Sequence, residues 1–222
     1  NVPSIASTVR ANPSAGFSIV SYAGNSVNNS TIGHGLNAAP KLIITKNRSA
    51  AYNWIVYSAE LAATKVLALD GTYAAFTPSG GYYGTVGSST YELVQGSSNL
   101  TNVNNNGNDY VAYCFAPVDG YSAMGSFVSG SNPFVYLGFR PSFILFKSTG
   151  SSNWDIYDSS RTPYNESNLT LAPNLSTAEY NAGVNGIDLL SNGFKCDGGQ
   201  NVNATFIYAA FAENPFKTAR AR

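Results

Sequence analysis

Short runs of β-branched and aromatic residues recur along the chain, and polar turn residues separate them. Residues 41–46 (KLIITK) and 143–147 (FILFK) each begin within two residues of a proline and end at polar residues, which is typical of strands. Residues 52–57 alternate, so that Trp54 and Ile55 lie on opposite faces, and we expect the Trp54 face to point inward and Ile55 to face a neighbouring module. Because no long helical period appears, the pattern predicts an all-β chain.

Two further segments, residues 110–116 and 206–212, are apolar on both faces. This is the pattern of a central strand that is covered on both sides. The large aromatic residues of these segments and the two tryptophans are therefore predicted to serve packing. We assign the structural core to Trp54, Trp154, Phe115 and Phe211.

Four blocks of the sequence occur twice, in the same order and about 100 residues apart. The matching pairs are Gly16-Phe17-Ser18 with Gly120-Tyr121-Ser122, residues 40–46 with 141–147, Asn53-Trp54 with Asn153-Trp154, and residues 110–116 with 206–212. A period of this length exceeds that of a solenoid or propeller unit and is the size of a small domain. The repetition indicates an internal duplication.

The duplication sets the predicted domain boundaries. We expect an N-terminal arm at 1–15, a first module at 16–118, a second module at 119–216 and a C-terminal tail at 217–222. Many short strands with turn signals every 8–12 residues are typical of β-sandwich or jelly-roll modules. The prediction is therefore two tandem, internally duplicated β-sandwich modules that pack together.

The charge balance disfavours several partners. Twelve Lys and Arg offset twelve Asp and Glu, so no basic field exists to hold the phosphates of a nucleic acid. Charged residues make up only 11% of the chain, and Asn, Ser and Thr carry most of its polarity. No apolar run approaches the length of a membrane span, so we expect no membrane insertion. Because the chain begins at Asn1 without a leader-like segment, we expect a processed product.

Residues suited to catalysis or metal binding are scarce. His34 is the single histidine, and a turn or surface position is favoured over a catalytic one. Asp155 and Asp158 are the most suggestive carboxylate pair, but residues three apart on a strand point to opposite faces. Residues 102–107 have the outline of a calcium loop with neutral Asn at the ligand positions, and we interpret them as a hairpin turn. We predict no catalytic residues, no metal and no cofactor.

The two cysteines, Cys114 and Cys196, are too few for a disulfide framework. Small buried apolar residues are the favoured interpretation, with a single bridge between them as the alternative.

Exposed aromatic residues are the most promising surface feature. Tyr82 and Tyr83 lie in a glycine-rich stretch (GGYYG) that we expect to be a loop too open to bury them. An aromatic face beside polar side chains suits sugar binding, which pairs stacking with directional hydrogen bonds. We predict ligand binding by Tyr82, Tyr83, Tyr73 and Asn105; the alternative is that the tyrosines fold back onto the sheet or onto a neighbouring subunit.

The repeated blocks resemble a known family. GFSIVSYAGN, GHGLNAAPKLIITKNRS, NWIVY and NDYVAYCFA in the first half, and PFVYLGFRP, SNWDIYDSSR, LLSNGFK and YAAFAENPFK in the second, are similar to a repeat family of bacteriophage and cyanophage virion proteins. Its members are known as tail-fibre or SPRY-like domains. The resemblance covers about residues 9–222, implies SPRY-like sandwich modules in a virion, and brings no catalytic residues with it. The chain departs from the family pattern in the Gly- and Tyr-rich segment 70–90.

Together these observations predict a non-enzymatic virion protein. Its expected function is attachment, as a tail-fibre domain that binds a host-surface glycan. The alternative is a structural role, as a capsid decoration or tail protein held by contacts with other virion proteins. Because virion parts act in many copies, we expect a homo-oligomer.

Overall fold

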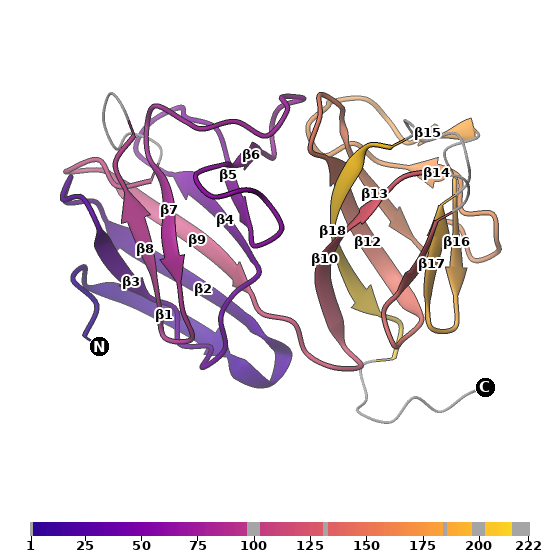
Figure 1. The fold of residues 1–222 in the computed structure, drawn as a ribbon, viewed down its shortest axis with the longest axis horizontal. Helices are drawn as coiled ribbons and strands as arrows, with labels where there is room; N and C mark the ends of the chain where they lie inside the picture. Colours follow the sequence, from indigo (N-terminus) through magenta and orange to yellow (C-terminus); the bar gives the residue numbers. More distant parts are fainter. Residues whose placement is uncertain (1, 97–102, 131–132, 184–185, 197–202, 215–222) are drawn as a thin grey trace. The chain divides into compact units, whose positions relative to one another are not determined.

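The computed structural model describes residues 2–96, 103–130, 133–183, 186–196 and 203–214. The chain is an all-β protein built from antiparallel sheets that form β-sandwiches (Figure 1). It divides into two compact units, Asn1–Ala116 and Pro117–Arg222. Within the described ranges, no helix is both long enough and apolar enough to cross a membrane.

The first unit contains a six-stranded and a three-stranded sheet. Its strands are β1 (Ser7–Asn12), β2 (Phe17–Ala23), β3 (Ser30–Gly33), β4 (Leu42–Asn47), β5 (Ile55–Ser58), β6 (Leu67–Ala68), β7 (Tyr82–Val86), β8 (Thr90–Val94) and β9 (Asp109–Phe115). The large sheet has the order β1-β2-β9-β4-β5-β6, and the small sheet has the order β3-β8-β7. A 3-10 turn, Pro13–Ala15, connects β1 to β2.

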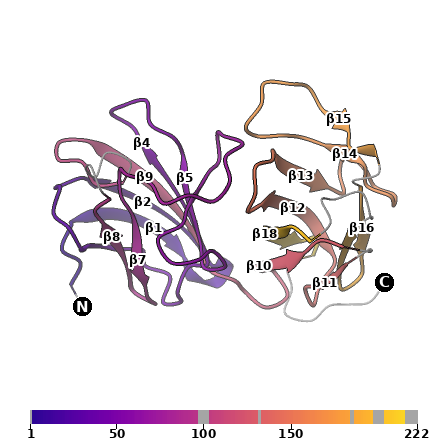
Figure 2. The ribbon, with the colours of Figure 1, turned by 45° about the horizontal axis from the view of Figure 1, so that its top comes forward.

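The second unit contains a four-stranded, a three-stranded and a two-stranded sheet. Its strands are β10 (Ser122–Val128), β11 (Phe134–Tyr136), β12 (Pro141–Ser148), β13 (Trp154–Asp158), β14 (Leu169–Thr170), β15 (Tyr180–Asn181), β16 (Ile187–Leu190), β17 (Gly193–Cys196) and β18 (Thr205–Ala212). The orders are β10-β18-β12-β13, β11-β17-β16 and β14-β15. Figure 2 shows β16 across the interior of this unit from β12 and β18.

The strand order of the first unit recurs in the second. In the larger sheets, the neighbours β2-β9-β4-β5 of the first unit match β10-β18-β12-β13 of the second, strand for strand along the chain. In the three-stranded sheets, β3-β8-β7 matches β11-β17-β16 in the same way. A duplicated sequence would fold in this way, because each repeated block would form the same strand. The duplication itself and the packing of the modules against each other stay predictions.

The segment 1–15, expected to be an arm, belongs to the first unit. Ser7–Asn12 forms β1 and pairs along its whole length with β2, while Ile5 is buried and bridges to Ile32. The sequence shows no clear strand pattern here, because Val9 is the residue of β1 that packs against the core. The first unit ends at Ala116 rather than at 118, and the predicted tail 217–222 lies outside the described residues.

Tyrosines dominate the core of the first unit. Tyr22, Tyr83, Tyr91 and Tyr110 are all buried in one apolar cluster. The Tyr22 hydroxyl donates to the Val103 carbonyl oxygen at 2.7 Å, and the Tyr83 hydroxyl donates to Thr45 Oγ1 at 2.6 Å. Hydrogen bonds of this kind allow a phenol to be buried without leaving its polar end unpaired.

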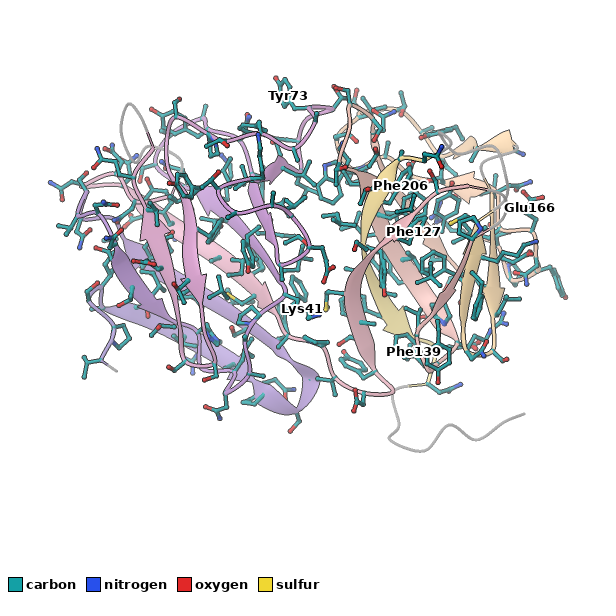
Figure 3. The ribbon with its side chains drawn as sticks, in the orientation of Figure 1. Lys41, Tyr73, Phe127, Phe139, Glu166 and Phe206 are labelled. Carbon is teal, nitrogen blue, oxygen red and sulfur yellow. The ribbon has the colours of Figure 1, made fainter. Side chains whose placement is uncertain are left out.

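Phenylalanines fill the corresponding core of the second unit. Phe127 stacks on Phe206 with ring centroids 5.3 Å apart, and it meets Phe146 and Phe194 edge to face. Phe127 and Phe206 lie in the interior of the unit (Figure 3). Each aromatic pair adds ~0.5–1.5 kcal/mol to the stabilisation that comes from burying its apolar surface. The cluster therefore helps to hold the four-stranded sheet against β17 of the three-stranded sheet.

The expected inward face of the tryptophan strand is reversed. Trp54 is half-buried and stacks on Tyr113 with ring centroids 6.4 Å apart, outside the core cluster. Ile55 is the residue that points into the core, opposite Thr45. Both faces of this segment are apolar, so the alternation by itself did not distinguish them.

Of the three other predicted core residues, one is buried and two are half-buried. Trp154 is buried, as predicted, whereas Phe115 and Phe211 are half-buried. Phe115 packs against Phe17, and Tyr110, Ala112 and Cys114 of β9 occupy the core side instead. Large tyrosines already fill that side, so the period of two sends Phe115 to the opposite face.

Candidate functional site

The first unit carries an open polar groove of about 390 Å³ on its large sheet. Its lining residues are Ala6, Ser7, Thr8, Ser21, Tyr22, Ala23, Arg48, Asp109 and Tyr110. This volume lies within the range of ~300–1,000 Å³ that is usual for small-molecule sites. The groove is therefore the candidate binding site of this unit.

Strand pairing positions the polar side chains of the groove. Thr8 of β1 lies opposite Ser21 of β2, and Ala23 of β2 lies opposite Asp109 of β9. Arg48 directly follows β4, and its backbone N–H donates to the Asp109 carbonyl oxygen at 2.8 Å. A guanidinium, a carboxylate and several hydroxyls thus lie where the four neighbouring strands β1, β2, β9 and β4 begin or end.

A stacked tyrosine pair lies behind the groove, on the core side of the same strands. The rings of Tyr22 and Tyr110 lie 5.1 Å apart and nearly parallel. The Tyr110 hydroxyl accepts hydrogen bonds from Asn47 Nδ2 at 3.2 Å and from the Asn105 backbone N–H at 2.8 Å. Burial raises the pKa of Tyr110, so the hydroxyl stays neutral near pH 7. Because neighbouring residues of a strand point to opposite faces, the two rings pack inside the core, whereas Thr8, Ser21 and Asp109 lie on the outer face that carries the groove.

The predicted binding role of Tyr83 is wrong. Tyr83 is only 5% exposed, and its ring packs between Tyr57 and Tyr91 in the core. Tyr82 is half-buried and also packs against the core cluster. Both residues lie on β7, which pairs with β8, so the glycine-rich stretch is a strand and not an open loop. The alternative interpretation, in which the tyrosines fold back onto the sheet, is the correct one.

The remaining predicted ligand residues do not come together into one site. Tyr73 is 58% exposed, lies after β6 and meets Phe76 edge to face at 6.2 Å (Figure 3). Asn105 is half-buried, does not line the groove, and donates its backbone N–H to the buried Tyr110 hydroxyl.

The groove residues Arg48 and Asp109 were missed in the sequence, although a signal for them exists. They flank the predicted strands 41–46 and 110–116, and antiparallel pairing of these strands brings both charges to one end of the sheet.

His34 is a structural residue with both ring nitrogens engaged. The Leu36 backbone N–H donates to Nδ1 at 3.3 Å, so Nε2 carries the proton and donates to the Gly87 carbonyl oxygen at 3.1 Å. The side chain is buried rather than at the surface as predicted, and burial lowers its pKa from the ordinary value. The neutral imidazole thus ties the end of β3 to the turn between β7 and β8.

This burial makes the stability of the protein sensitive to acid. His34 contributes its full stability above the ordinary pKa of 6.5, and that contribution falls as pH drops toward the lowered folded pKa, because only the unfolded chain takes up the proton. We expect the unfolding free energy of the wild type to approach that of His34→Gln as pH falls from 7 to 5. Chemical denaturation at each pH measures the gap, and a constant gap would contradict the assignment.

The two aspartates of β13 face opposite sides of their sheet. Asp155 lies opposite the core residue Phe146, and Asp158 lies opposite Phe143 on the other face. Burial raises the pKa of Asp155 to about 6, although the Tyr180 hydroxyl donates to it at 3.2 Å. Asp158 instead forms an ion pair with Arg161, and this pairing outweighs burial and keeps its pKa low. The two carboxyls cannot flank one glycosidic bond.

The outline of a calcium loop at 102–107 forms turns before β9, with residue 102 outside the described part. It is not the predicted hairpin, because the strands before and after it, β8 and β9, belong to different sheets. Asn104 Nδ2 donates to Asn25 Oδ1 and to the Val27 carbonyl oxygen, and Gly107 has a φ of +79°. The side-chain oxygen of Asn104 accepts the Asn25 backbone N–H. Among the residues that the structure describes, no three His, Cys, Asp or Glu side chains gather as a metal site.

Neither Cys114 nor Cys196 forms a disulfide, and both are buried, each in the core of a different unit. The interpretation as small apolar residues is confirmed. Burial raises the pKa of the Cys114 thiol to about 12, so it is unreactive near neutral pH.

Comparison with known proteins identifies one family. No curated protein and no solved structure matches the chain. A family model described as a domain of unknown function, DUF7483, matches residues 2–215, which include both units and every groove residue. The chain therefore belongs to the DUF7483 family.

Proposed function

We propose that this chain is a non-catalytic attachment module of a virion, and that it binds a neutral host-surface glycan in the groove of the first unit. The observation that carries the proposal is the composition of the groove. It combines one guanidinium, one carboxylate and three serine or threonine hydroxyls in an open depression on the large sheet.

A saccharide matches this set of groups better than an anion does. Sugar hydroxyls can donate to Asp109 and accept from Arg48 and from the serine and threonine hydroxyls in the same pose. A phosphate would meet a single cation beside a carboxylate, in a chain whose net charge is zero. The groove therefore favours a ligand that both donates and accepts hydrogen bonds without carrying charge.

The virion setting rests on the sequence. The repeated blocks are similar to those of phage virion repeat proteins, and a surface rich in Asn, Ser and Thr suits adaptable polar contacts. A shallow groove binds one sugar weakly, and many copies on a particle would turn weak contacts into firm attachment. For this reason we include homo-oligomeric display and location in the virion in the proposal.

Binding by an arrayed protein tests the proposal. We would biotinylate the chain, display it on avidin and probe a glycan array, with Arg48→Met and Asp109→Asn as groove variants. Each should lower the signal for the preferred glycan at least ~10-fold, because a lost hydrogen bond to a charged group costs ~1.5–3 kcal/mol. Arg10→Met is the matched control, since Arg10 is also an exposed arginine of the large sheet but does not line the groove.

The outcomes are distinct. Binding that the groove variants lose and the Arg10 variant keeps would support the proposal. Absence of binding by the displayed wild type, or equal binding by all variants, would contradict it and favour the structural role among virion proteins.

A further inference from the structure

The short strand β11 exposes two aromatic rings on one face. Phe134 and Tyr136 are 48% and 69% exposed, whereas Val135 between them is 8% exposed and packs into the core. The alternation follows from the period of two in a strand. β11 lies at the end of its sheet, next to β17. Phe134 and Tyr136 together are called the aromatic platform below.

Glycines keep the platform open. Gly193 of β17 lies directly opposite Tyr136 and offers no side chain to cover its ring. A β-carbon at Gly193 would come within 3.2 Å of the Phe134 ring and within 2.0 Å of the Val135 carbonyl oxygen. Gly138, with a φ of +79°, lies beside the Tyr136 hydroxyl. Neither Gly193 nor Gly138 therefore places a side chain over the Tyr136 ring.

Polar side chains continue the same face. Lys195 of β17 lies opposite Phe134, and Asp188 of β16 lies opposite Lys195, so the three form one row across the sheet. Lys195 and Asp188 are both half-buried. The face thus combines two rings with one cation and one carboxylate.

We propose that the aromatic platform is a second saccharide-binding site, in which pyranose rings stack on Phe134 and Tyr136 while Lys195 and Asp188 bond to ring hydroxyls. The C–H groups of a sugar face are slightly positive and meet the negative face of an aromatic ring favourably. A few polar groups beside aromatic rings are the usual composition of small-molecule sites. The site lies in the second unit and does not depend on the groove of the first.

The test uses the full chain with the groove variants Arg48→Met and Asp109→Asn combined, so that the groove no longer contributes to binding. Isothermal titration would measure its affinity for soluble cello-, malto- and chito-oligosaccharides. We expect binding of at least one of them. Adding Phe134→Ser and Tyr136→Ser should weaken that binding at least tenfold. Tyr164→Ser is the control, because Tyr164 is an aromatic residue of the same unit that is 83% exposed and lies outside the platform.

Failure of this proposal is distinguishable from failure of the proposed function. Binding to none of the three oligosaccharides, or equal binding with and without the platform rings, would overturn the second site and leave the groove untouched. Sedimentation that shows a dimer in the parent chain and monomers after Tyr136→Ser would also overturn it, since the platform would then join two copies. Unchanged thermal melting of the serine variants excludes unfolding as the cause of lost binding.

Discussion

Tyr83→Ala should destabilise the protein by about 3–5 kcal/mol, the range for removing a large aromatic side chain from a core. Tyr83 is buried between Tyr57 and Tyr91, and its hydroxyl bonds to Thr45. The variant would lose the packing of the ring and leave a cavity between the sheets of the first unit. Urea unfolding followed by tryptophan fluorescence or circular dichroism measures the difference.

Tyr73→Ala is the matched control for this prediction. Tyr73 is an exposed tyrosine of the same unit, so its removal should change the unfolding free energy by less than ~0.5 kcal/mol. If Tyr83→Ala were as mild as Tyr73→Ala, then Tyr83 would not be a core residue and its original interpretation as a surface ligand would return.

Gly193→Ala should destabilise the second unit by about 1–3 kcal/mol or more, as overpacking a well-packed site does. The new β-carbon would lie 2.0 Å from the Val135 carbonyl oxygen, which belongs to the backbone of the neighbouring strand and can move only by disturbing the pairing of β11 with β17. Thermal unfolding should therefore begin at a lower temperature, and hydrogen exchange should rise in Phe134–Tyr136.

The control for this substitution is Gly130→Ala. A β-carbon at Gly130 meets no described atom within 4 Å, so the same added methyl group should have little effect there. Equal destabilisation by both variants would show that the close approach of β11 to Gly193 is not what requires the glycine.

Much of the strand content could be predicted because it depends on local pattern. The predicted strands 41–46, 110–116 and 206–212 agree within about one residue with β4, β9 and β18. β-Branched and aromatic runs between polar turns suffice for such assignments. The shared strand order of the two units also agrees with the repeated blocks.

Local pattern does not determine which face of a strand points into the core or which strands become neighbours. Trp54 and Ile55 are both apolar, so the sequence could not tell which of them enters the core. β1 contributes little apolar surface, so the sequence predicts an arm at residues 1–15. In the structure, this strand pairs with β2 and supplies lining residues of the groove. The site depends on which strands become neighbours, and that is a property of the whole sheet.

Mapping a bound sugar onto the chain tests the central claim most directly. Backbone amide shifts of the isotope-labelled protein would be followed while the oligosaccharide with the strongest array signal is added. In the first unit, we predict chemical-shift changes concentrated at Thr8, Ser21, Arg48 and Asp109, which line the groove. Shifts in that unit that avoid all four residues, or no shifts there at saturation, would contradict it.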